Sequence, residues 1–270
     1  MLKKRLIACL VWSKGMIVQS IGFKHTNVVG NAITAVDFFN TWAVDEIVIL
    51  NASREDEYAP EFLQVIEGLS ERCFVPLTAG GWITDCDNIR ELLANGADKV
   101  IVNTHGFRHP DFITRASTKF GRQCIVVSID TRLNEQGFHE VYIDRGREPT
   151  GMDAVTWAKT AEAKGAGELF VTSIDQDGAR NGYDCELLSI ISDQVDIPVI
   201  ASGGVGEWAH MVDGITRGKA DAVSAANIFH FHEQSTKIAK DHLLEAGLDV
   251  RDPVFYKIRL PRKPVYNIYR

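Results

Sequence analysis

Two glycine-containing turns of similar sequence carry the clearest chemical pattern in this chain. The segments VPLTAGGWITD (75–85) and IPVIASGGVGE (197–207) lie 122 residues apart, and in each an apolar run ends in paired glycines ahead of a helical pattern. Backbone amides without a Cβ in front of them can bind phosphate at a helix N-terminus. One pair alone would favour a tight turn that needs glycine for backbone reasons only. Two copies at one offset favour phosphate binding at Gly80, Gly81, Gly203 and Gly204.

Polar side chains end three other apolar runs. Asn103, Asp130 and Thr172 supply an amide, a carboxylate and a hydroxyl, which are groups that can orient a substrate and transfer protons. We therefore expect chemistry at the end of the fold where these runs finish.

Four charged residues begin other runs, and their formal charges cancel: Arg5, Glu46, Lys99 and Glu168. Charge is common where a strand begins in contact with solvent, and the residues alone somewhat favour that interpretation. Alternatively the four side chains point inward, where charges persist only as mutually hydrogen-bonded pairs. They would then close a pore that admits something small.

Eight strand and helix units must position these residues. The short apolar runs cover 5–12, 46–53, 74–81, 99–104, 124–130, 168–175, 198–204 and 222–229, and helical patterns follow at roughly 31–43, 60–72, 84–95, 109–120, 152–165, 184–195, 206–217 and 233–246. Alternating units with strands apolar on both faces predict an α/β fold, a closed (β/α)8 barrel. The 122-residue repeat predicts an internal half-barrel duplication. The long connections 13–29 and 131–150 are expected to cover the active site.

Residues two apart on a strand share a face, so the pattern also sorts the barrel interior. The predicted inward set is Arg5, Ile7, Cys9 and Val11; Glu46, Val48 and Leu50; Lys99, Ile101 and Asn103; Cys124, Val126, Ser128 and Asp130; and Glu168, Phe170 and Thr172. The charged members then lie at the N-terminal end of the barrel, and the polar members lie at the C-terminal end.

Composition narrows the class of protein. The 270 residues are 45% hydrophobic with a net charge of −7, which argues against nucleic acid or a membrane surface as the main partner. Without a signal peptide or a spanning apolar run, the chain is expected to be cytoplasmic. The five cysteines lack metal spacing and are expected to be reduced; no metal or cofactor is expected.

We divide the chain into a barrel, 1–249, and a basic, aromatic extension, 250–270, that could bind an anionic ligand or pack on the barrel.

Several motifs together resemble the cyclase subunit of imidazole glycerol phosphate synthase over about residues 3–249. They include KKRLIACL at the start, ADKVIVNT at 97–104, VVSID at 126–130 and ELFVTSIDQDGARNGYD at 168–184. The resemblance implies a barrel that receives ammonia from a glutaminase partner at its N-terminal face and uses it on a phosphorylated substrate at the other end. It favours the inward, pore-closing interpretation of the four charged residues, and it implies that Asp98 contacts the glutaminase.

The resemblance also assigns roles at the C-terminal end. It implies catalysis by Asp130, with Asp177, Thr172 and Asn103 beside it. The implied substrate- and phosphate-binding residues are Gly80, Gly81, Thr104, Gly178, Gly203, Gly204, Ala226 and Asn227.

The N-terminal half departs from the family pattern at four positions. Val11 replaces one of two acid/base aspartates, Gln19 replaces a lysine, Asn51 replaces an aspartate, and Trp82 replaces the last glycine of the first phosphate turn. Trp82 could offer a flat face to a ring or sugar, or it could be a packed surface residue.

These departures predict a changed substrate. We expect an ammonia-accepting synthase that acts on a phosphorylated or nucleotide-linked sugar. One alternative is a working cyclase of histidine biosynthesis that tolerates Val11. Another is a barrel without catalytic activity that docks and activates a glutaminase or delivers ammonia to a separate enzyme.

Overall fold

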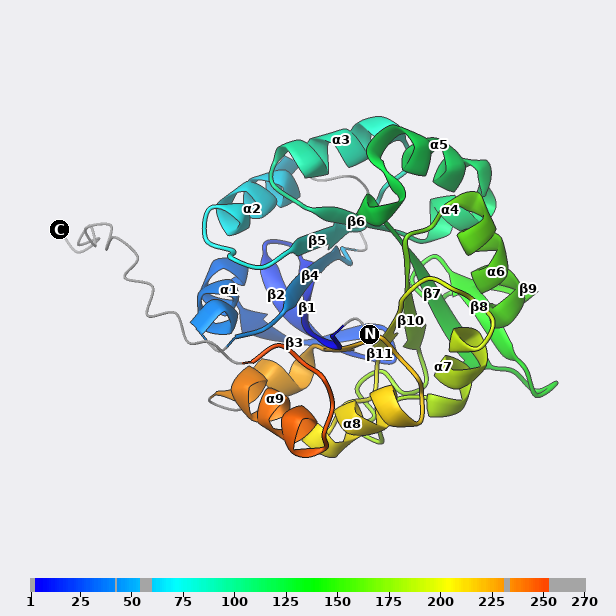
Figure 1. The fold of residues 1–270 in the computed structure, drawn as a ribbon. Coiled ribbons are helices and arrows are strands. Elements are labelled where there is room, and N and C mark those ends of the chain that lie inside the picture. The colour runs from blue at the N-terminus through cyan, green and yellow to red at the C-terminus, as the bar shows by residue number, and fades with distance from the viewer. Residues whose placement is uncertain (1–2, 42, 54–59, 231–233, 253–270) are drawn as a thin grey trace.

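The computed structural model describes residues 3–41, 43–53, 60–230 and 234–252. Eight parallel strands close into a barrel, because β10 (Glu168–Ser173) pairs with both β11 (Val199–Ser202) and β7 (Ile125–Leu133). Between them the order runs through β12 (Ala222–Ala225), β1 (Arg5–Ser13), β4 (Glu46–Asn51), β5 (Leu77–Gly80) and β6 (Lys99–Val102). The predicted (β/α)8 barrel is therefore confirmed, and each predicted run overlaps one of these strands, although β1 and β7 extend beyond their runs (Figure 1).

Helices surround the barrel as the alternating pattern predicted (Figure 1). They are α1 (Ala32–Thr41), α2 (Pro60–Ser70), α3 (Cys86–Ala94), α4 (Thr104–Arg108), α5 (Asp111–Phe120), α6 (Ala154–Lys164), α7 (Cys185–Ser192), α8 (Trp208–Thr216) and α9 (Ser235–Glu245). Local sequence sets several of their ends. The Asp85 carboxylate accepts bonds from the first amides of α3, and Gly165 ends α6 in the left-handed conformation. None of the described helices is both long and apolar enough to cross a membrane.

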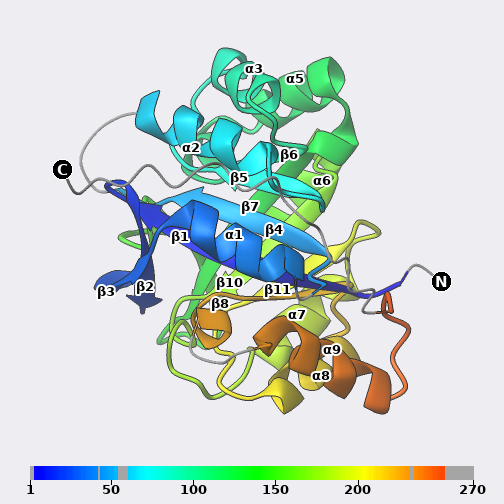
Figure 2. The same ribbon diagram turned by 90° about the vertical axis from the view of Figure 1, so that its left-hand side faces the viewer.

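The two long connections are β-hairpins rather than irregular loops. The first contains β2 (Met16–Ile21) and β3 (Lys24–Gly30), and the second contains β8 (His139–Ile143) and β9 (Glu148–Asp153). They extend β1 and β7, the first strand of each predicted half-barrel. Figure 2 shows the first hairpin at the end of the barrel away from the N-terminus, where the strands finish.

Burial divides the apolar side chains into two clusters. The larger one fills the layer between strands and helices. The smaller one, called here the lumen cluster, lies inside the barrel and consists of Ile7, Cys9, Val48, Ile101, Val126, Phe170, Ile200 and Ala222. The predicted alternation of faces holds for all members of this cluster except Ile200 and Ala222, for which no face was predicted. Cys124 is the exception, because it precedes β7 in a 3-10 turn (Arg122–Cys124) and packs against the larger cluster.

The described chain ends are tied together at the N-terminal face of the barrel. Lys4 forms a β-bridge with Val250, and its amide donates to the Asp249 carbonyl. Residues 253–270 of the predicted C-terminal extension lie outside the described residues. All five cysteines are free thiols, as expected.

Candidate active site

A cavity of about 750 Å³ opens at the C-terminal mouth of the barrel. Eleven of the twelve residues predicted to be catalytic or to bind substrate line it: Asn103, Asp130, Thr172, Asp177, Gly81, Thr104, Gly178, Gly203, Gly204, Ala226 and Asn227. Gly80 is the exception. It ends β5 and packs against Ile101, where a Cβ would come within 2.9 Å of that residue.

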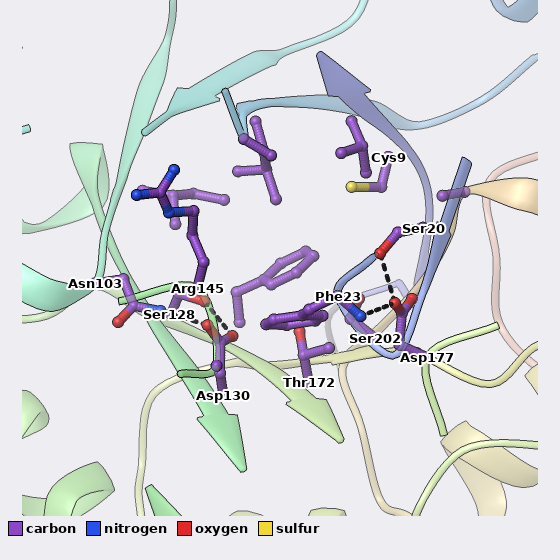
Figure 3. Close-up of a pocket in the computed structure, with 18 of the residues that line it drawn as sticks. Cys9, Ser20, Phe23, Asn103, Ser128, Asp130, Arg145, Thr172, Asp177 and Ser202 are labelled. Carbon is purple, nitrogen blue, oxygen red and sulfur yellow. Dashed lines mark hydrogen bonds between the residues drawn. The ribbon is translucent and has the colours of Figure 1, made fainter. Parts of the chain in front are cut away.

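Asp130 occupies the floor of this cavity with two hydrogen-bond donors. Asn103 Nδ2 lies 2.6 Å from Asp130 Oδ2, and Ser128 Oγ lies 3.1 Å from Oδ1 (Figure 3). Burial, which leaves Asp130 only 6% exposed, and the smaller effect of the Asp177 charge together raise its pKa to about 7 despite these two bonds. A carboxyl group with this pKa can accept and return a proton at neutral pH.

Asp177 faces Asp130 from the other side of the cavity and is held by the first hairpin (Figure 3). Its Oδ2 accepts a 2.6 Å bond from Ser20 Oγ and a 3.0 Å bond from the Phe23 amide. The Gly22 amide also donates to the Asp177 carbonyl, and Asn227 Nδ2 donates to the Ser20 carbonyl. The hairpin is therefore docked on the C-terminal half of the mouth.

The second glycine turn keeps a tight backbone. Gly203 and Gly204 have φ values of +86° and +109°, and a Cβ on Gly204 would lie 2.0 Å from the Gly182 carbonyl oxygen. Side chains are thus excluded, and the backbone after β11 can approach an anion closely. Gly178 (φ +74°) is similarly packed against Ile21 of the hairpin.

The first glycine turn is built differently, and a residue that sequence analysis missed completes it. Trp82 keeps the left-handed φ of a glycine, +60°. The guanidinium of Arg145 lies 4.7 Å from the centre of the Trp82 ring. Both line the cavity. The sequence left Trp82 either open to a ring or sugar or packed at the surface, and in the structure the indole carries a cation. Nearby, the Thr104 hydroxyl accepts a bond from the Asp144 amide.

The remaining substitutions of the N-terminal half fall at the same end of the barrel. Val11 and Asn51 line the cavity. Asn51 Oδ1 accepts a bond from the Ser53 amide, whereas Asn51 Nδ2 is buried without a hydrogen-bond partner in the part of the chain that the structure describes. Gln19 is buried in the hairpin, where its Oε1 accepts a bond from Asn27. The amide of Gln19 therefore supports the hairpin.

The four charged residues at the opposite end form a closed ring. Arg5 contacts Glu46 at 2.8 Å and Glu168 at 3.1 Å, while Lys99 contacts the same two carboxylates at 3.2 and 3.0 Å. Their side chains are 25% (Arg5), 2% (Glu46), 16% (Lys99) and 13% (Glu168) exposed. The inward interpretation of these residues is therefore the one the structure adopts.

The lumen cluster connects the charged ring with the cavity. Cys9, Ile101 and Phe170 belong to that cluster and also line the cavity. Burial raises the pKa of the Cys9 thiol to about 12, so the thiol is neutral at physiological pH. The axis of the barrel thus runs from four paired charges through uncharged side chains to Asp130.

Asp98, the predicted partner contact, lies just before β6 at the N-terminal face. Its Oδ2 accepts a 2.8 Å hydrogen bond from the Leu77 amide at the start of β5. This hydrogen bond connects Asp98 to the start of β5, so Asp98 supports the barrel itself in addition to any role in binding a partner.

Comparison with known protein families agrees with this geometry. The model of the histidine biosynthesis protein family matches residues 5–235, which span all eight barrel strands and every residue of the charged ring. Members of that family are barrel isomerases and cyclases. The chain therefore belongs to the family of histidine biosynthesis proteins.

Proposed function

We propose that this chain is the ammonia-accepting synthase subunit of a glutamine amidotransferase and acts on a phosphorylated or nucleotide-linked sugar. The observation that carries the proposal is the common axis of the charged ring, the lumen cluster and Asp130. A ring of four paired charges at one end of the barrel could control the entry of a small molecule there. Ammonia is small and uncharged as NH3, so it can cross a lumen lined by uncharged side chains.

The charge of the mouth supports an anionic substrate. Six lysine and arginine residues line the cavity against three aspartates, although the whole chain carries a net charge of −7. The backbone turn at Gly203 and Gly204 would bind a phosphate group. Clustered cations also attract anions from solution and raise their local concentration.

Asp130 would carry the proton transfers. Ammonia that leaves the lumen attacks an electrophilic carbon of the bound substrate, and its nitrogen then gives a proton to the Asp130 carboxylate. The same proton passes to the departing oxygen of the substrate, so Asp130 returns to its starting state. Asn103 and Ser128 hold the carboxylate in place, and Thr172 lies beside it to orient the substrate.

The partner prediction is that the chain forms a one-to-one complex with a glutaminase subunit through the N-terminal face of the barrel. Copurification and glutaminase assays measure this directly. Substitution of Asp98 by Asn should weaken the complex, whereas Arg108→Met at the opposite mouth should leave it intact. If the two proteins do not associate, and this chain does not change glutamine turnover, the proposal is wrong.

A second prediction separates the proposal from a working cyclase of histidine biosynthesis. The purified chain with ammonia is expected to make imidazole glycerol phosphate about two to four orders of magnitude more slowly than an ordinary cyclase, because Val11 cannot transfer a proton. The rate is measured with the cyclase substrate and excess ammonium. A rate within about tenfold of an ordinary cyclase would establish the histidine-pathway activity instead.

Val11 also favours a second candidate function, a barrel that only docks the glutaminase or passes its ammonia to another enzyme. Such a barrel would need the charged ring and the lumen but not the carboxylate of Asp130. Substitution of Asp130 distinguishes the two functions, because only the synthase needs its carboxylate.

A further inference from the structure

We propose that the N-terminal half of the cavity contains a carboxylate-binding subsite formed by Arg145, Trp82 and Asn51. The inference rests on the proposed function, because it names a group on the substrate of that same cavity. Trp82 lies against Arg145, and Arg145 and Asn51 are joined through one residue, Ser53. Arg145 Nη1 donates to the Ser53 carbonyl at 2.6 Å, and Asn51 Oδ1 accepts from the Ser53 amide at 3.1 Å.

The position of Arg145 is fixed, and one edge of its guanidinium carries only a long ion pair. Nη1 is bonded to Ser53, and the guanidinium lies over the Trp82 ring. On the other edge Nη2 lies 3.6 Å from the Asp144 carboxylate, which accepts two shorter bonds, 2.7 and 2.8 Å, from Arg147, so a ligand carboxylate would compete there with a weak contact. The edge formed by Nε and Nη2 is the one that binds two oxygens at once.

Asn51 supplies a second donor to the same cluster. Its Oδ1 is bonded to Ser53, so the amide presents Nδ2, which is buried in the wall and has no partner within the described residues. A buried unpaired donor is costly in the free protein. A rotation of the amide toward the cavity, which both residues line, would let a ligand oxygen held by Arg145 satisfy this donor, whereas an aspartate at this position would repel that oxygen.

The geometry favours a carboxylate over a phosphate. A carboxylate is planar and can lie in the plane of the guanidinium, with both oxygens on the Nε and Nη2 edge. A tetrahedral phosphate would direct at least one oxygen out of that plane, at a position where the indole already lies beside the guanidinium. The local charge agrees as well, because Arg145, Arg147 and Asp144 sum to a single positive charge.

Backbone conformation also marks this corner of the cavity. Trp82, Asp144 and Arg145 have φ values of +60°, +49° and +59°, a region that side-chain-bearing residues rarely occupy. Such conformations persist where surrounding structure enforces them, and they gather at functional sites. Here they place the indole and the guanidinium against each other.

The test uses the full chain without glutaminase or glutamine and three sugars that differ in one group: D-glucuronate, D-glucose and D-glucose 6-phosphate. Ligand-observed NMR titrations at constant ionic strength measure the affinities. Glucuronate is expected to bind at least about tenfold more tightly than glucose. Arg145→Met and Asn51→Asp should each remove that preference, and Arg145→Lys should lose most of it because lysine lacks the planar fork.

Arg108→Met is the matched control, because it removes one positive charge from the same mouth outside the subsite. It should keep the preference for glucuronate, and melting curves verify that each variant is folded. Equal binding of glucuronate and glucose would overturn the subsite. So would tighter binding of glucose 6-phosphate that depends on Arg145, or a preference that only Arg108→Met abolishes. None of these results affects the glutaminase experiment, so failure of the subsite and failure of the proposed function are distinguishable.

Discussion

Asp130→Asn is expected to lower turnover of the physiological substrate, with ammonia supplied directly, at least about a hundredfold. Asparagine keeps the shape of the side chain but cannot transfer a proton. It can also keep both neighbours, since its oxygen can accept from Asn103 while its nitrogen donates to Ser128, whose hydroxyl rotates to accept. The loss should therefore appear in turnover while the fold is retained.

The same variant has a second readout that needs no substrate. The pKa of Asp130 is about 7 in the folded chain, against 3.8 for an ordinary aspartate. The protonated carboxyl therefore stabilises the fold fully below about pH 4, and this contribution is lost as the pH rises to about 7. Asparagine has no such loss. Relative to the native chain, Asp130→Asn should gain stability between about pH 4 and about pH 7, as measured by urea unfolding.

Two results would contradict this account of Asp130. A variant with nearly full turnover would place the chemistry elsewhere or make the barrel a conduit for ammonia. A stability difference that does not change with pH would mean that the carboxyl is not desolvated. Ser128→Ala is a useful control, because it removes one hydrogen bond to Asp130 and leaves the titrating group in place.

Sequence periodicity predicted the barrel because each strand is short, apolar on both faces and followed by an amphipathic helix. The period of two also placed Ile101, Val126 and Phe170 in the lumen, since strand geometry alone decides the face. It failed at Cys124, where a 3-10 turn precedes the strand. The hairpins were expected as loops because their segments are polar and lie at the mouth, where pairing depends on the extension of β1 and β7.

Sequence reasoning about the site succeeded where a residue ends a strand. Asn103, Asp130 and Thr172 follow from strand register, so the cavity gathers them as expected. Val11 lowers the local polarity and removes a neighbouring negative charge, and these effects shift the pKa of Asp130 in opposite directions, so the sequence left its direction undecided. In the structure burial decides it. Arg145 was missed because it comes from the second hairpin, and its contact with Trp82 exists only once the barrel brings β5 and β7 into place. The one signal in the sequence was a tryptophan where a glycine was expected.

The second large effect is expected at the charged ring. Glu46→Gln should lower the free energy of unfolding by about 3 kcal/mol, the lower end of the range for breaking a buried ion pair, because Arg5 remains partly hydrated. Glu46 is the most buried member and contacts both Arg5 and Lys99, while Thr78 Oγ1 donates to it at 2.8 Å. Urea unfolding measures the change. Glu168→Gln is the matched control and should cost less, because its side chain is more exposed.

A double variant tests whether the ring acts as one unit. Glu46→Gln leaves Lys99 with one carboxylate fewer, so removing the lysine charge as well, with Lys99→Met, should recover part of the lost stability. If the two effects simply add, the residues are independent charges at a solvent-exposed end, as the sequence alone somewhat favoured. In the complex with glutaminase, an opened ring should also release more ammonia to solution for each glutamine hydrolysed. If the two substitutions are coupled in stability but ammonia release does not change, the ring only stabilises the barrel. That result would remove the main support for ammonia transfer through the barrel.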